Sequence, residues 1–294
     1  MIDWFERRMR LGSGLVDILF YDLVALSDME LLQVAEAKEG EIIVVSPGFG
    51  MGEIPVYSTV DAFMEACGGP GGVDTLVIAG VGSSAAGTAA LAKNVANVLE
   101  RRVAGIVSSL GWRDVFTHGI KGLTAERLSD RVDSTFQFWS GLWREVTSDL
   151  LWGQMVRFRL KGSYVEGIPE SEILMSLLRR NQNSMRTLVG HSKGGLSIAN
   201  ALFGLRDHSA IENPHLNVVT FGCGVNVPSV YQHVFQYIGT WDMLGITNTT
   251  AKGELWRGLN WVWFKGHDTN SLNQFHLPVV EILKELKPRL LGES

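Results

Sequence analysis

The sequence predicts an α/β fold with a doubly wound, mostly parallel sheet. Apolar runs of strand length alternate with helical patterns along most of the chain, and this alternation places helices on both faces of a parallel sheet. A Gly-x-Ser-x-Gly sequence, Gly190 to Gly194, joins one apolar run directly to a helical pattern, as a sharp strand-to-helix turn would. Hydrophobic residues make up 46% of the 294 residues, which is enough for the core of one domain over residues 1–294.

Residues 1–40 are predicted to form an N-terminal helical segment, because leucine and isoleucine recur there at three- and four-residue steps. The segment also has aromatic and basic residues that would suit peripheral contact of this helix with a membrane surface, namely Trp4, Phe5, Arg7, Arg8 and Arg10. A helix packed on the body of the protein explains the same pattern, so both interpretations stay open.

Two groups of segments supply the predicted sheet and its helices. The first group contains strands 42–46, 75–80 and 103–108 and helices 56–67 and 85–99. The second group contains the strand before Gly190, the helix 196–205, strands 217–221, 233–238 and 259–264, and a closing helix 277–286 that accepts Pro278 in its first turn.

Residues 112–183 interrupt this alternation with aromatic residues at helical spacing, among them Phe136, Trp139 and Trp143. We expect a helical insertion over the C-terminal edge of the sheet, acting as a lid or as the wall of an acyl-chain pocket. The same spacing is also typical of plain core packing.

Ser192 lies at the centre of the Gly-x-Ser-x-Gly sequence, where a strained turn would hold its hydroxyl clear of the backbone. Gly190 and Gly194 fit such a turn, because a Cβ at either position would collide with the crossing strand and helix. The N–H of Lys193, at a helix N-terminus, is the expected first donor to an oxyanion. We expect His191 to point away from the site. An ordinary glycine-rich turn is the alternative, since the chain has 33 glycines.

A serine nucleophile needs an imidazole to take its proton and a carboxylate to orient that imidazole. In a doubly wound sheet these groups follow the C-terminal ends of strands. Asp242, just beyond strand 233–238, is the predicted acid, although an aspartate there also suits a turn or a helix cap. His267, directly after the last strand, is the predicted base. His276, near the start of the closing helix, is the alternative base.

A second oxyanion donor should come from a loop after an earlier strand. Gly82 and Ser83, in the glycine-rich loop after strand 75–80, are the first candidates. Phe49, in the glycine-rich loop after strand 42–46, is the alternative.

These motifs carry a resemblance to a known family. The segments Gly190-His191-Ser192-Lys193-Gly194-Gly195, Gly239-Thr240-Trp241-Asp242 and Lys265-Gly266-His267 resemble those of an α/β-hydrolase, and with Thr220-Phe221-Gly222 the chain resembles more narrowly the class 3 lipase-like branch of serine esterases and lipases. The resemblance covers about residues 40–290. It implies an α/β-hydrolase fold in which Ser192, Asp242 and His267 act on a carboxylic ester. The branch usually carries an apolar residue in place of Lys193.

The sequence therefore predicts a carboxylic ester hydrolase with a Ser-His-Asp triad, without cofactor or metal, that acts on a small apolar acyl ester or a lipid. A catalytically inactive, hydrolase-like binding scaffold is one alternative. Nucleotide binding through Gly80-Val81-Gly82 is another, because a strand, a glycine loop and a helix mimic a dinucleotide fingerprint. Strand 103–108, however, ends without the acidic residue that would bind the ribose.

Charge and cysteine content argue against other classes of protein. A net charge of −5, with no run rich in Lys and Arg, argues against a nucleic-acid partner. Cys67 and Cys223 cannot build a disulfide framework, and no ligands at zinc spacing occur. We find neither a signal peptide nor a transmembrane segment, and expect a cytoplasmic protein. The sequence does not indicate an oligomeric state.

Overall fold

The computed structural model describes residues 14–50, 52–69, 71–80, 83–108, 164–180, 184–208, 213–249 and 258–293. In chain order its elements are α2 (Gly14–Phe20), the 3-10 helix η1 (Leu23–Ala25), α3 (Asp28–Val34), β1 (Ile42–Val45), β2 (Val56–Tyr57), α4 (Val60–Cys67), β3 (Thr75–Ile78), α5 (Ala85–Leu99), β4 (Val103–Ile106), α8 (Pro169–Arg180), β5 (Thr187–His191), α9 (Lys193–Asp207), β6 (Asn217–Phe221), β7 (Val234–Gly239), α10 (Met243–Asn248), β8 (Asn260–Val262) and α12 (Val279–Leu291).

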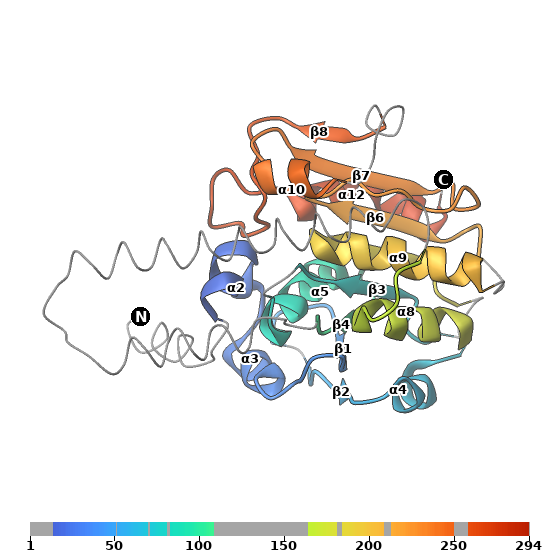
Figure 1. The fold of residues 1–294 in the computed structure, drawn as a ribbon. Helices are drawn as coiled ribbons and strands as arrows, with labels where there is room; N and C mark the ends of the chain where they lie inside the picture. The colour runs from blue at the N-terminus through green and yellow to red at the C-terminus, as the bar shows by residue number, and fades with distance from the viewer. Residues whose placement is uncertain are drawn as a thin grey trace, which may run out of the picture.

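The strands form one eight-stranded sheet in the order β2-β1-β4-β3-β5-β6-β7-β8 (Figure 1). Strands β3 to β8 run parallel to one another, whereas β1 runs antiparallel to β2 and β4. The doubly wound, mostly parallel sheet that the sequence predicted is confirmed. Ile78 pairs with Gly190, and Phe221 pairs with Tyr237, so β3, β5, β6 and β7 end at the same edge. The loops that follow these strands therefore gather at that edge.

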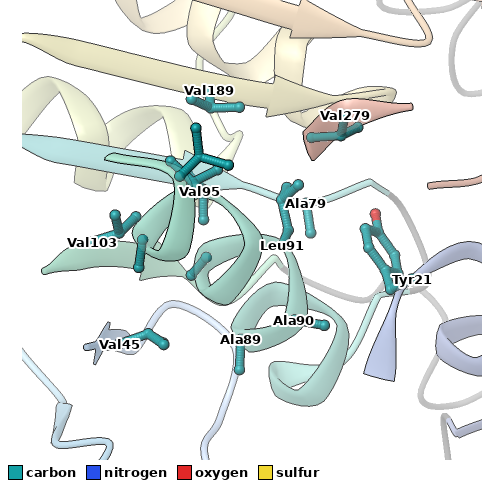
Figure 2. Packing of buried hydrophobic residues seen from close by; sticks show 14 of the residues in the cluster. Tyr21, Val45, Ala79, Ala89, Ala90, Leu91, Val95, Val103, Val189 and Val279 are labelled. Atoms are coloured by element: carbon teal, nitrogen blue, oxygen red, sulfur yellow. The ribbon is translucent and has the colours of Figure 1, made fainter. Parts of the chain in front are cut away.

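Side chains of the strands alternate between two faces, and separate helices cover each face. Val77 and Val189 belong to the core that includes α5 and α12, while their neighbours Leu76 and Leu188 belong to the core that includes α4, α8 and α9. Figure 2 shows Val95 of α5 close to the sheet residues Val103 and Val189. Burying each such aliphatic side chain contributes about 1.5–3 kcal/mol, so both helix layers are held to the sheet by apolar contact.

Several predicted elements have the expected bounds, among them Ala85–Leu99 and Asn217–Phe221. The helix predicted from residue 56 begins only at Val60, because Tyr57 pairs with Ile42 in the sheet and the Thr59 side chain caps the helix by accepting from the Ala62 N–H. The short apolar sequence before Thr59 therefore forms the edge strand β2.

Part of the predicted architecture lies outside the described residues. Residues 112–163 and 181–183 of the predicted insertion lie outside them, so the lid stays a prediction. The described part of the insertion, residues 164–180, contains helix α8. Also outside the described residues are Trp4, Phe5, Arg7, Arg8 and Arg10, so membrane contact of the N-terminal helix stays a prediction as well. In the parts of the chain that are described, no helix has both the length and the apolar character needed to cross a bilayer.

A buried ion pair fastens the N-terminal segment to helix α5. Lys93 Nζ lies 2.5 Å from Glu30 Oε1 and 2.9 Å from the carbonyl oxygen of Ser46, and both charged side chains are almost fully buried. Glu30 also accepts from the backbone N–H of Ser27, at the start of α3. The pair thus connects α3, α5 and the loop after β1.

Replacing Lys93 by Met should lower the free energy of unfolding by about 3–5 kcal/mol, because the buried Glu30 carboxylate would lose its counter-charge. The exposed pair of Lys287 with Glu100 provides the control, and Lys287→Met should leave stability nearly unchanged, because water screens a surface ion pair. Urea unfolding of both variants at pH 7 measures the difference. Equal effects of the two substitutions would contradict the role given to the buried pair.

Candidate active site

Ser192 forms the tight turn between β5 and α9. Its φ of 53° is in the left-handed region that residues with a side chain rarely adopt. A Cβ at Gly190 would lie 2.6 Å from Gly195 Cα, and a Cβ at Gly194 would overlap the carbonyl oxygen of Ile78 in β3. Strand and helix can therefore cross this closely only because both positions are glycine. The mostly parallel sheet and this sharp strand-to-helix turn are both features of the α/β-hydrolase fold that the resemblance implied.

Three side chains from three loops meet at the C-terminal edge of the sheet. His267 Nε2 lies 2.9 Å from Ser192 Oγ, and His267 Nδ1 lies 2.8 Å from Asp242 Oδ1. Since a carboxylate only accepts, Nδ1 carries the proton and Nε2 can accept the hydroxyl proton of Ser192. The structure thus brings together Ser192, His267 and Asp242 in a hydrogen-bonded chain.

Asp242 is 1% exposed and also serves as the N-cap of α10, where its Oδ1 accepts from the backbone N–H of Gly245 at 2.5 Å. The same carboxylate therefore contacts the His267 ring and caps the helix. Gly222, with a φ of +64°, provides room for the pair, because a Cβ there would lie 2.9 Å from His267 Nδ1.

His276 lies elsewhere in the loop. Its Nδ1 is 2.6 Å from the carbonyl oxygen of Asn273, at an exposed position. Of the two candidate bases, His267 is the one within hydrogen-bond distance of Ser192.

The expectation that His191 points away from the site was wrong. Its ring lies 4.9 Å from the ring of His267, its Nε2 is 2.9 Å from the His267 carbonyl oxygen, and its Nδ1 is 2.9 Å from the hydroxyl of Tyr21. Burial, with a smaller contribution from His267, lowers the pKa of His191 to about 3, so this imidazole is neutral. The loop carrying His267 crosses the end of β5, which the sequence alone does not show.

The N-terminal segment 17–22 contacts several loops of the site, which the sequence analysis did not anticipate. Figure 1 shows α2 beside the loop that follows β8. The carbonyl oxygen of Phe20 accepts from the backbone N–H and the hydroxyl of Thr269, at 2.7 and 2.8 Å. The Tyr21 hydroxyl accepts from the Gly80 N–H at 2.6 Å. Residues far apart in the sequence are thereby held around Ser192.

Asp17 ties the same segment to the start of α5. Its carboxylate accepts from the backbone N–H of Ser84 at 3.1 Å and from the Ser84 hydroxyl. Burial raises the pKa of Asp17 to about 6, and the hydrogen bonds with Ser84 only partly oppose that shift.

The oxyanion candidates differ in where they lie. Lys193 is the first residue of α9, and the first N–H groups of a helix have no acceptor within the helix. Ser83 follows β3, next to β5 in the sheet; its N–H donates to the Gly80 carbonyl at 3.3 Å and its hydroxyl to the Ser84 carbonyl. Gly82 lies outside the described residues.

Phe49 does not lie near Ser192, which corrects that alternative. Strand β1 is antiparallel to β4, so the loop after Val45 leaves the sheet at the edge where β4 begins with Val103, opposite to the edge of Ser192. The neighbouring Gly48 N–H donates to Asn97, near the far end of α5, and the Phe49 side chain is exposed.

The Lys193 ammonium is paired. Its Nζ lies 2.9 Å from Glu170 Oε1 of α8, and both side chains are at most 9% exposed. The turn therefore carries a buried ion pair beside Ser192 rather than an isolated positive charge. In the described residues, no group of His, Cys, Asp and Glu side chains is arranged to hold a metal ion.

No family model matches the chain, and no curated protein does. Among solved structures, the chain is similar to EstE7, an HSL homologue from a metagenome library, with 10% identity, a TM-score of 0.42 and 90% of both chains covered. It is also similar to a mutant of LAE6, an α/β-hydrolase enzyme from the metagenome of Lake Arreo, Spain, with 10% identity, a TM-score of 0.44, and 97% of this chain and 89% of that chain covered. Such values do not identify a substrate.

The raised pKa of Asp17 predicts a pH dependence of stability. Because the folded-state pKa of about 6 exceeds the ordinary value of 3.8, the contribution of Asp17 is full below about pH 4 and is lost as the pH rises through 6. Relative to Asp17→Asn, the wild type should lose about 2 kcal/mol of unfolding free energy between pH 4 and pH 7. Urea unfolding at several pH values measures this difference, and parallel curves for the two proteins would refute it.

Proposed function

We propose that this protein is a serine hydrolase that cleaves carboxylic esters through an acyl-enzyme on Ser192. The hydrogen-bonded chain from Ser192 through His267 to Asp242 is the observation that carries the proposal. It lies at the C-terminal edge of the sheet, where a doubly wound fold presents its ligands. The serine at a strained strand-to-helix turn and the order Ser, Asp, His along the chain both support it.

In the first half of the reaction, the Ser192 oxygen attacks the ester carbonyl carbon while its proton passes to His267 Nε2. Asp242 accepts from Nδ1–H throughout, which keeps the ring in the tautomer that can take this proton and stabilises the imidazolium that forms. His267 then gives the proton to the alkoxide leaving group, and the acyl group stays on Ser192. Water, activated by the same imidazole, hydrolyses the acyl-enzyme in the second half.

The negative charge that develops on the carbonyl oxygen requires donors in a fixed position. We assign the Lys193 N–H, at the start of α9, as the first donor, since the helix dipole also favours an anion there. The loop after β3 is the source of the second donor. Ser83 would serve by giving up its turn hydrogen bond to Gly80.

An apolar acyl ester or a lipid ester is the substrate class that the surroundings of the site favour. The ring of Trp241, adjacent to Asp242, contacts that of Phe264 edge to face and that of Phe275 at a tilt. Phe264 and Phe275 precede and follow His267 in sequence, and all three side chains are substantially exposed. An exposed aromatic cluster suits an apolar group. The Glu170 carboxylate compensates the charge of Lys193, so this ion pair adds no net charge beside Ser192 that would favour a charged substrate. A class 3 lipase-like esterase is consistent with both features.

Ser192→Ala should abolish covalent labelling by a fluorophosphonate probe and lower the turnover of p-nitrophenyl butyrate by at least about 10³-fold, because the attacking oxygen would be removed. Labelling is read by mass spectrometry of the intact protein and of its peptides. Ser58→Ala removes an exposed hydroxyl and should label like the wild type. A folded wild type without label or turnover would instead favour a catalytically inactive scaffold.

The two late histidines provide a matched comparison of the base. His267→Ala should lower kcat by about 10³-fold or more, because the Ser192 proton would have no acceptor. His276→Ala should leave kcat close to that of the wild type, since the hydrogen bond of this ring goes to Asn273 in its own loop and not to Ser192. Steady-state kinetics on the same ester measure both, and a larger loss in the His276 variant would overturn the assignment of His267.

A further inference from the structure

We propose that Tyr21 and His191 form a neutral hydrogen-bonded brace that sets the position of the loop carrying His267, which makes both of them positioning residues for ester hydrolysis. This inference rests on the proposed function and extends it to residues outside the triad. Neither side chain has to touch the substrate for this role, because both act through the backbone of His267.

The polarity of the brace follows from its two ends. The Gly80 N–H can only donate, and it lies 2.6 Å from the Tyr21 hydroxyl oxygen. The hydroxyl proton is therefore available for His191 Nδ1, at 2.9 Å. His191 then carries its proton on Nε2, which donates to the His267 carbonyl oxygen, a pure acceptor, at 2.9 Å. Of the two neutral tautomers of His191, only the Nε2–H form satisfies all three hydrogen bonds.

Burial keeps the brace in this single state. Tyr21 is 2% exposed and His191 is 1% exposed, so neither can exchange its partner for water without opening the site. The low pKa of His191 keeps its ring uncharged at the pH at which a serine hydrolase works. A second positive charge 4.9 Å from the His267 ring would oppose the imidazolium that forms during the reaction.

The brace connects two parts of the site whose relative position matters for the reaction, the backbone beside Ser192 and the backbone of His267. Gly80 lies against the nucleophile, since a Cβ there would be 3.1 Å from Ser192 Cβ. The His267 carbonyl belongs to the residue whose ring contacts Ser192 Oγ. Figure 2 shows the Tyr21 side chain near Ala79, the residue directly after β3. A displacement of about 1 Å between reacting groups can lower a rate about 10²-fold, so this hydrogen-bonded chain should affect kcat rather than KM.

Three variants test the kinetic role. Tyr21→Phe removes only the hydroxyl and should lower kcat about tenfold with KM nearly unchanged, while His191→Leu removes both hydrogen bonds and should lower kcat about 10²-fold. His191→Gln keeps an N–H near the Nε2 position and should recover much of the loss. Tyr57→Phe is the matched control, because its hydroxyl contacts Cys67 far from the site; its kcat should match the wild type.

A spectroscopic measurement separates positioning from a merely structural role. Long-range ¹H–¹⁵N correlation spectra of histidine-labelled wild type should show His191 as the neutral Nε2–H tautomer between pH 5 and pH 8. In folded Tyr21→Phe the Nδ1 resonance of His191 should shift, because this nitrogen loses its hydrogen-bond donor, and the His267 resonances should shift as well. Because the wild type alone reports the tautomer, the measurement stays decisive even if a variant fails to fold.

The outcomes distinguish a failure of the proposed Tyr21–His191 brace from a failure of the proposed ester hydrolysis. A wild type that neither labels nor turns over esters would remove the proposed function. An active wild type whose Tyr21→Phe and His191→Leu variants keep wild-type kcat would overturn the brace. So would an Nδ1–H or protonated His191 in the wild type, or activity losses that match only the unfolded fraction of each variant in thermal melts.

Discussion

The close crossing of β5, β3 and α9 at Ser192 is the constraint on which the rest of the site depends. Ser192 adopts a positive φ, and conformations of this kind cost on the order of 1–3 kcal/mol, so they persist only when the surroundings over-determine them. Gly190 and Gly194 remove the steric obstacle, but they do not hold the turn in place. The packing around the turn has to supply that restraint.

Local sequence was sufficient to predict the elbow and the groups that reach it. Gly190 to Gly194 imposes its geometry within five residues, and Asp242 and His267 follow strands whose ends the parallel pairing brings to one edge. The antiparallel direction of β1 was beyond this reasoning, because an apolar run shows that a strand is buried but not which way it runs. Phe49 therefore appeared to be a candidate although its loop leaves the opposite edge.

Contacts made by residues 17–22 could not be read from the sequence for a different reason. Asp17 and Tyr21 meet partners between 59 and 170 positions away, and no spacing rule links them. His191 was misplaced for the same reason, since its partner is a backbone carbonyl that any residue at position 267 would offer. Polar side chains in an apparently amphipathic N-terminal helix were the available signal, because a buried carboxylate requires donors.

The strained turn is thus held from both faces of the sheet by segments outside the strand and helix repeat. On one face, Tyr21 hydrogen-bonds to Gly80, which lies against Ser192, and to His191, which directly precedes Ser192. On the other face, Glu170 of α8 pairs with Lys193, the residue directly after Ser192. An isolated lysine there would have to be desolvated beside a nucleophile, whereas the paired one links α8 to the first turn of α9. This explains how a charged residue can occupy an elbow position that otherwise suits an apolar one.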